Sequence, residues 1–184
     1  MFFSGYYLLT MDRFPHQSLK TYLDTHGAIR NQDAALIIKQ LVLAVRYMHD
    51  MGLVHRDLNV ANVWIPDLQS SGMEKLSIKV VDFSYSCPVG RGSQLQAFVG
   101  DPLYHSPERS SGVFYGQSAD IWSIGIIAHL LLTQNYPFYG ESIEQIRDRI
   151  INCNPVLKNG LDRYATDFIG KCLMKDSNLR PTAA

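Results

Sequence analysis

The sequence predicts a mainly α-helical fold with a few short β-strands. Apolar residues recur at the three- and four-residue spacing of an amphipathic helix over residues 32–51. The stretch 121–132 is apolar at all but two positions, which is typical of a helix buried on every side. Residues 62–65 and 78–81 form short runs rich in Val and Ile, and such runs favour strands.

The N-terminal part is expected to hold one strand and two helices. Aromatic and apolar residues cluster over Tyr6–Asp12, which favours a strand. Ser18 is a good N-cap for a short helix over residues 19–23. The longer helix at Gln32–Met51 should end at Gly52, because glycine readily adopts the conformation that closes a helix.

The rest of the chain is predicted to alternate between loops and helices. A polar, turn-rich loop at 66–72 joins the two central strands. Residues 82–108 show no periodic pattern, and a loop of that length in a compact domain is usually functional or disordered. Three further helices are expected, at 120–133, 141–152 and 164–174.

Composition excludes several classes of function. The 184 residues are 46% apolar and 18% charged, as in folded domains. Seventeen basic and seventeen acidic residues cancel, so we expect no nucleic-acid or membrane partner. Three cysteines without a C-x-x-C spacing argue against a disulfide framework or a Cys-rich zinc site and fit a cytoplasmic location. The apolar run at 121–132 is too short to span a bilayer, and the N-terminus lacks the features of a signal peptide.

The strongest chemical signal is the segment His55–Asn62, which reads HRDLNVAN and lies between the long helix and a strand. It contains Asp57 and Asn62, and a second acid, Asp82, follows the next strand. Carboxylate and amide oxygens at neighbouring strand ends suit Mg²⁺. A further aspartate could orient a hydroxyl and accept its proton. Such a set suits phosphoryl transfer, in which positioning and charge neutralisation supply most of the catalysis.

These residues resemble the protein kinase family over about the whole chain. Five motifs occur in the order of that family: His55-Arg56-Asp57 with Asn62, Asp82-Phe83-Ser84, Ser106-Pro107-Glu108, Asp120–Gly125 and Arg180-Pro181. Each motif is weak alone, but five in order make coincidence improbable. The segments 100–108 and 131–140 are most similar to serine/threonine kinases of the calcium/calmodulin-dependent group.

The resemblance implies the large, C-terminal lobe of a protein kinase domain, with residues 1–14 as a hinge-strand remnant, 15–184 as the large lobe, and the small lobe almost entirely missing. ATP and Mg²⁺ are the implied cofactors, and a protein substrate or scaffold partner the implied partner. Asp57 would be the catalytic base, and Asn62 and Asp82 the metal ligands. Asp12 and Phe14 would face the adenine, and Trp64 would lie at the floor of its pocket.

Several positions depart from the family pattern. Asn59 stands where serine/threonine kinases carry a lysine that offsets phosphoryl charge, and losing such a donor costs ~10²–10³ in rate. Asp101 replaces a threonine, so two carboxylates are expected to face each other, raising a pKa or pushing the loop apart. Trp64 is larger than the usual leucine and could fill the pocket. The alternative is therefore a pseudokinase or scaffold that uses the large lobe for protein binding, and a fragment of a longer active kinase is a third reading.

Other polar residues are expected to be structural. His55 is interpreted as a packed loop histidine, and His129 as a core histidine with its hydrogen bonds satisfied. Asp120 should accept backbone hydrogen bonds, because a buried acid needs partners. Glu108 and Arg180 should form a buried ion pair that fixes a loop.

Overall fold

The computed structural model describes residues 2–3, 6–7, 16–66, 76–90, 95–158 and 160–184. Two short strands come first, β1 (Phe2–Phe3) and β2 (Tyr6–Tyr7), and they pair antiparallel. The strand predicted over Tyr6–Asp12 is therefore seen at its first two residues, and the rest of that prediction lies outside the described residues.

Two helices follow, as predicted. α1 (Leu19–His26) begins at Ser18, whose hydroxyl accepts a hydrogen bond from the Thr21 N–H at 3.1 Å. α2 (Asn31–Asp50) ends beside Gly52, which has a φ of 71°. Because the buried positions of α2 lie three and four residues apart, one face of the helix enters the core: Ala34, Ile37, Ile38, Leu41, Val45 and Met48.

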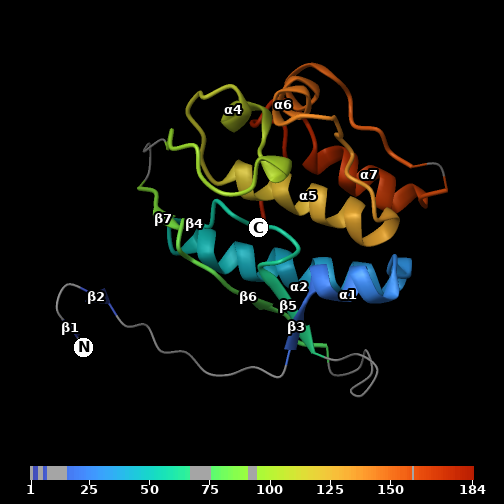
Figure 1. Ribbon diagram of the computed structural model, residues 1–184, viewed down its shortest axis with the longest axis horizontal. Coiled ribbons are helices and arrows are strands. Elements are labelled where there is room, and N and C mark those ends of the chain that lie inside the picture. The colour runs from blue at the N-terminus through green and yellow to red at the C-terminus, as the bar shows by residue number, and fades with distance from the viewer. Residues whose placement is uncertain (1, 4–5, 8–15, 67–75, 91–94, 159) are drawn as a thin grey trace.

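The core is organised around α5 (Ser118–Thr133), which lies between α2 and α7 (Arg163–Cys172) in Figure 1. Nearly every α5 side chain is buried, which explains why its sequence shows no polar face. α6 (Ile143–Asn152) lies on the side of α5 away from α2 (Figure 1). Among the helices of the described residues, none is both long enough and apolar enough to cross a bilayer.

Two small antiparallel sheets bring the loops together. In the first, the order is β3 (His16–Ser18), β5 (Val63–Pro66), β6 (Lys79–Val80). In the second, β4 (Leu53–Val54) pairs with β7 (Cys87–Pro88). The strands predicted at 62–65 and 78–81 are β5 and β6. The loop from β4 to β5 and the loop from β6 to β7 consequently run between the same two sheets.

The prediction that residues 82–108 are irregular is only partly right. This stretch contains β7, the 3₁₀ helix η2 (Pro102–Tyr104) and the start of the short helix α4 (Pro107–Ser110). Leu95 also forms an isolated bridge with Tyr115, through mutual backbone hydrogen bonds of 2.9 Å. These elements depend on contacts with distant residues, which periodicity in the sequence does not register.

Candidate active site

The loop between β4 and β5 is anchored by Asp120, an α5 side chain that is 1% exposed. Its carboxylate accepts hydrogen bonds from the N–H groups of His55 at 2.9 Å and Arg56 at 3.1 Å. His49 Nε2 donates a third bond, at 2.9 Å. The Arg56 guanidinium donates through Nε to the carbonyl of Tyr85. The structural role predicted for Asp120 is confirmed, since it fixes the start of the loop.

His55 ties this loop to the one after β6. Its ring is buried, its Nδ1 accepts from the Asp57 N–H at 3.3 Å, and its Nε2 donates to the Val81 carbonyl at 3.2 Å. Its ring centroid lies 5.0 Å from that of Phe83. Burial lowers the pKa of His55 despite the attraction of nearby Asp120. The interpretation of His55 as a packed loop histidine is confirmed.

Asp57 is half-buried and its carboxylate is held by three donors. Asn62 Nδ2 donates to Oδ2 at 3.0 Å. Asn59 Nδ2 donates to Oδ1 at 3.1 Å, and the backbone N–H of Asp101 donates to the same oxygen at 3.1 Å. The side chain is thus oriented from two loops, and Oδ2 accepts only the Asn62 bond from the described residues. An oriented carboxylate with a free lone pair can take a proton from a hydroxyl.

The sequence led us to expect that the carboxylates of Asp57 and Asp101 would either raise a pKa or push the loop apart, and the two loops remain joined. The Asp101 side chain turns away and caps η2 by accepting the Leu103 N–H at 3.0 Å, while its own N–H bonds Asp57. Burial raises the pKa of Asp101, the Leu103 bond opposes that rise, and the charge of Asp57 adds to it. The expected pKa rise is therefore present, but the backbone bridges the two residues.

Asn62 and Asp82 lie at the same end of the first sheet. β5 and β6 pair Val63 with Val80, and the Val81 N–H donates to the Asn62 carbonyl at 2.9 Å. Asp82 follows directly, at a φ of 60°. The structure thus brings Asn62 against Asp57 and places Asp82 one residue beyond the bond that joins the strands.

The donors at this end suit a hard cation. Asn62 uses its amide nitrogen on Asp57, so its Oδ1 makes no hydrogen bond to a described residue. Asp82 is exposed, and its Oδ1 accepts from the Ser84 N–H at 3.2 Å and from the Ser84 hydroxyl. These bonds lower the pKa of Asp82. Mg²⁺ commonly takes one or two protein oxygens and completes its shell with phosphates and water, so the residues fit it. Within the described residues, no cluster of three or more His, Cys, Asp or Glu could hold a metal ion.

The adenine residues predicted from the sequence are only partly described. Asp12 and Phe14 lie outside the described residues. Trp64 lies on β5 opposite Ser18 and Lys79, and its indole N–H donates to the Ala61 carbonyl at 3.0 Å. The ring is half-buried and is held against the loop that carries Asp57.

Nearly the whole chain is similar to known proteins. The protein kinase domain family matches residues 4–184. The chain belongs to the protein kinase domain family. It is 35% identical over 161 residues to myosin light chain kinase A of Dictyostelium discoideum, covering 85% of this chain and 53% of that protein. It is 33% identical over 172 residues to SNF1-related protein kinase catalytic subunit alpha KIN12 of Arabidopsis thaliana, covering 94% of this chain and 33% of that protein.

These findings confirm the family predicted from the five motifs, and both relatives are consistent with the serine/threonine group that the motifs indicated. The mainly helical fold also agrees with it. The chain spans about half and about a third of the lengths of these two relatives. Protein kinase domains in general use ATP and Mg²⁺ and act on proteins.

A buried ion pair joins α4 to the C-terminal segment of this kinase domain. Arg180, whose side chain is 0% exposed, donates to both oxygens of Glu108 at 2.6 and 2.7 Å. It also donates to the Met174 carbonyl at 2.7 Å and the Ser118 carbonyl at 3.1 Å. The predicted pair is confirmed, and it fixes α4 against the C-terminal segment. His129 lies in the core as predicted, and its Nδ1 bonds the Asn135 carbonyl at 2.7 Å. Its buried Nε2 has no hydrogen-bond partner among the described residues, so the prediction that all its hydrogen bonds are satisfied is only partly right.

Two site features were not predicted from the sequence. His49 lies 71 positions before Asp120, and no motif links them. Gly100 was noticed only as part of a motif, yet a Cβ added there would lie 2.8 Å from Asp57 Oδ1. The available signal was the glycine itself, because a glycine before a turn often marks a close backbone approach.

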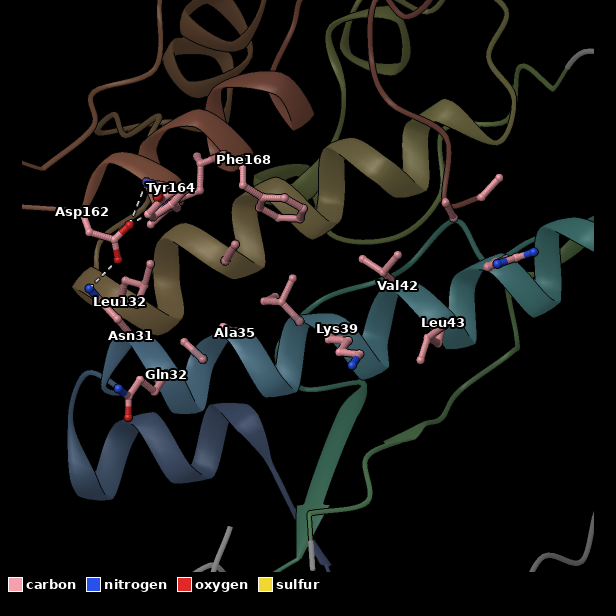
Figure 2. A pocket seen from close by; sticks show the side chains of 18 residues that line it. Asn31, Gln32, Ala35, Lys39, Val42, Leu43, Leu132, Asp162, Tyr164 and Phe168 are labelled. Atoms are coloured by element: carbon pink, nitrogen blue, oxygen red, sulfur yellow. Dashed lines mark hydrogen bonds between the residues drawn. The ribbon is translucent and has the colours of Figure 1, made fainter. Parts of the chain in front are cut away.

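A pocket of about 730 Å³ lies elsewhere in the kinase domain, between α2, α5 and α7 (Figure 2). It is lined mainly by apolar side chains, among them Val42, Leu132 and Phe168, and Asp162 at one end bonds Asn31 at 2.7 Å. None of the predicted site residues lines it. The pocket is therefore not part of the candidate active site.

Proposed function

We propose that this kinase domain transfers the γ-phosphoryl group of ATP to serine or threonine hydroxyls of a protein substrate. The observation that supports this most directly is the hydrogen-bonded carboxylate of Asp57. It contacts Asn62 at 3.0 Å and Asn59 and the Asp101 N–H at 3.1 Å, which fixes its direction without occupying every lone pair. Preorganised geometry of this kind is the main contribution an enzyme makes to phosphoryl transfer.

In the proposed reaction Asp57 is the catalytic base. As the hydroxyl oxygen of the substrate bonds to the γ-phosphorus, its proton passes to the Asp57 carboxylate, and the bond between the γ-phosphorus and the bridging oxygen breaks to release ADP. His55 supports this role indirectly, because its Nδ1 holds the N–H of Asp57 at 3.3 Å. Its own buried ring, bonded to Val81, is not free to act as the base.

The nucleotide and its metal would be held by residues on both sides of Asp57. Asn62 and Asp82 are the proposed Mg²⁺ ligands, and bound Mg²⁺ would neutralise charge on the phosphates. Asp12 and Phe14 are proposed to bind adenine through their backbone, with Trp64 against its face. Asn62 reaches the site because the Val81 N–H fixes its backbone at 2.9 Å.

We further propose that this kinase domain is divided into a hinge-strand remnant, residues 1–14, and the large lobe, residues 15–184. The proposed partner is a protein, either a substrate or a scaffold, rather than nucleic acid or a membrane. A cytoplasmic location is supported by Cys87, Cys153 and Cys172, which are free thiols.

One observation favours the second candidate function, a pseudokinase or scaffold that uses the large lobe for protein binding. At residue 59 the donor to Asp57 is a neutral amide, so no cation from this position would offset charge on the phosphoryl group. We therefore expect slow turnover at best, with a deficit of ~10²–10³.

The test has two measurements. Mg-ATP binding is monitored by the thermal shift of the protein, and activity is measured as transfer of labelled γ-phosphate to a generic protein acceptor. We expect a shift and slow transfer, and we expect Asp57→Asn to abolish transfer while keeping the shift. The double variant Asn59→Lys with Asp101→Thr loses the Asn59 amide bonds to Asp57, a cost of ~10–10², but restores a charge that is worth ~10²–10³. Since threonine can also still cap η2, the net effect should be a rise in transfer. A shift without any transfer would favour the pseudokinase. The absence of both the shift and the transfer at the natural full length of the protein would refute the kinase proposal.

A further inference from the structure

The side chain of Asn59 uses both ends of its amide inside the loop. Nδ2 donates to the Asp57 carbonyl and to Asp57 Oδ1, both at 3.1 Å. Oδ1 accepts from the Ala61 N–H at 2.8 Å and the Asn62 N–H at 3.1 Å. Both acceptors lie at one end and both donors at the other, so the orientation of the amide is fixed by its partners.

Asn59 is also 8% exposed, which removes its hydrogen bonds from competition with water. Its neighbours close the network, because Asn62 Nδ2 donates to the Asp57 carbonyl at 2.9 Å and to Asp57 Oδ2 at 3.0 Å. Asp57, Asn59 and Asn62 therefore form a single hydrogen-bonded unit. Loss of the whole Asn59 side chain should therefore affect both of the others.

We propose that Asn59 is a positioning residue that sets the base and the metal ligand at once, with separate ends of its amide. This inference rests on the proposed roles of Asp57 and Asn62. The NH₂ end sets the direction of the Asp57 carboxylate. The carbonyl end closes the turn at Ala61 and Asn62 and so places the Asn62 side chain. The position supplies geometry to phosphoryl transfer and no charge.

Two variants separate the ends of the amide without changing charge. In Asn59→Ser the hydroxyl can still accept from an N–H two residues later, but it is too short to hold the Asp57 carboxylate. In Asn59→Ala both functions are lost. Asn135→Ser is the matched control, because Asn135 Nδ2 also donates to a carbonyl two residues earlier, that of Thr133 at 2.6 Å, and its side chain makes no hydrogen bond to Asp57, Asn59 or Asn62.

We expect Asn59→Ser to lower kcat by ~10–10²-fold, the usual effect of a slightly misplaced catalytic group, with Mg-ATP affinity unchanged. Asn59→Ala should lower kcat and also weaken Mg-ATP binding. Hydrogen exchange supplies a readout independent of activity: the Ala61 amide should exchange faster in Asn59→Ala and stay protected in Asn59→Ser. The control variant should match the unmodified protein in all three measurements.

All assays run well below the melting temperatures of the variants, so that a loss of turnover does not reflect unfolding. Equal kcat in Asn59→Ser and the unmodified protein would overturn the role of the NH₂ end, without affecting the proposed function. Equal Ala61 exchange in Asn59→Ala and the unmodified protein would overturn the role of the carbonyl end. If the unmodified protein at its natural full length neither binds Mg-ATP nor transfers phosphate, the proposed function fails instead, and this inference fails with it.

Discussion

Gly100 lies so close to the loop that carries Asp57 that no side chain fits there. Its φ is 78°, and an added Cβ would lie 2.7 Å from the Arg56 carbonyl oxygen and 2.8 Å from Asp57 Oδ1. The first atom belongs to the backbone and the second is held by hydrogen bonds from Asn59 and Asp101, so a methyl group would move the backbone. The N–H of Asp101, which bonds Asp57 at 3.1 Å, would move with it.

We therefore expect Gly100→Ala to abolish phosphate transfer and to lower the unfolding free energy measured by urea denaturation. Gly112→Ala is the control, because Gly112 has a φ of 72° but nothing within 4 Å of the added Cβ. The control should lose only the ~1–2 kcal/mol of left-handed strain, and Gly100→Ala a further ~1–3 kcal/mol for the collision. Equal losses in the two variants would show that the contact with Asp57 is unimportant.

At this scale the sequence predicts residue types better than it predicts side-chain directions. The pattern His55–Asn62 pointed to Asp57 and Asn62, and the structure places these two in contact at 3.0 Å. The turn of the Asp101 side chain toward Leu103 could not be predicted, because it depends on η2, whose three residues have no periodic signal. Asn59 was recognised as a missing charge, but its four hydrogen bonds require coordinates.

At the scale of elements, the helices of eight or more residues and the strands β5 and β6 were predicted, but the other short elements mostly were not. α2, α5, α6 and α7 follow the 3.6-residue period of their buried faces or are apolar throughout, so local sequence suffices. β3, β4, β7 and α4 span two to four residues each, and they exist because distant segments pair or pack with them. One of them, β4, leads directly into the loop that carries Asp57.

α5 and α7 pack closely against each other at Gly125. Gly125 on α5 lets the helices approach so closely that an added Cβ would lie 2.7 Å from Cys172 Cβ and 2.9 Å from Leu173 Cδ2. We expect Gly125→Ala to lower the unfolding free energy by ~1–3 kcal/mol, because the helices must separate.

Gly170 on α7 is the matched control for Gly125, since an added Cβ there meets nothing within 4 Å. Gly170→Ala should raise the unfolding free energy by ~1 kcal/mol through helix propensity. Chemical denaturation of both variants measures the sign of the change in unfolding free energy for each. A stabilising Gly125→Ala would contradict the close packing of α5 on α7.

At the scale of the whole molecule, buried ionisable groups link stability to pH. Burial lowers the pKa of His105 to about 4, and the nearby Arg109 guanidinium contributes to the shift. Burial also lowers the pKa of His55 and of His129. For Glu108, burial raises the pKa but the hydrogen bonds and charge of Arg180 outweigh it, and the net pKa is lowered. All four groups make the folded protein resist protonation.

The lowered pKa values should make the unfolding free energy depend on pH. Because the unfolded chain binds a proton at His105 near pH 6.5 and the folded protein only near pH 4, the unfolding free energy should be greatest above pH 6.5 and fall as the pH is lowered toward 4. His105 alone accounts for a fall of about 3 kcal/mol. Below the ordinary pKa of a glutamate, protonation of Glu108 removes the partner of Arg180 and adds a second fall.

Urea denaturation between pH 7.5 and 4 measures the first fall, and His105→Gln tests its origin. The glutamine amide can still donate a hydrogen bond, as His105 Nε2 does to the Val99 carbonyl at 2.8 Å, but it does not titrate. We expect a clearly smaller slope of unfolding free energy against pH in this variant, with the remainder due to His55 and His129. An unchanged slope would show that His105 is not the group that couples folding to pH, since glutamine does not titrate.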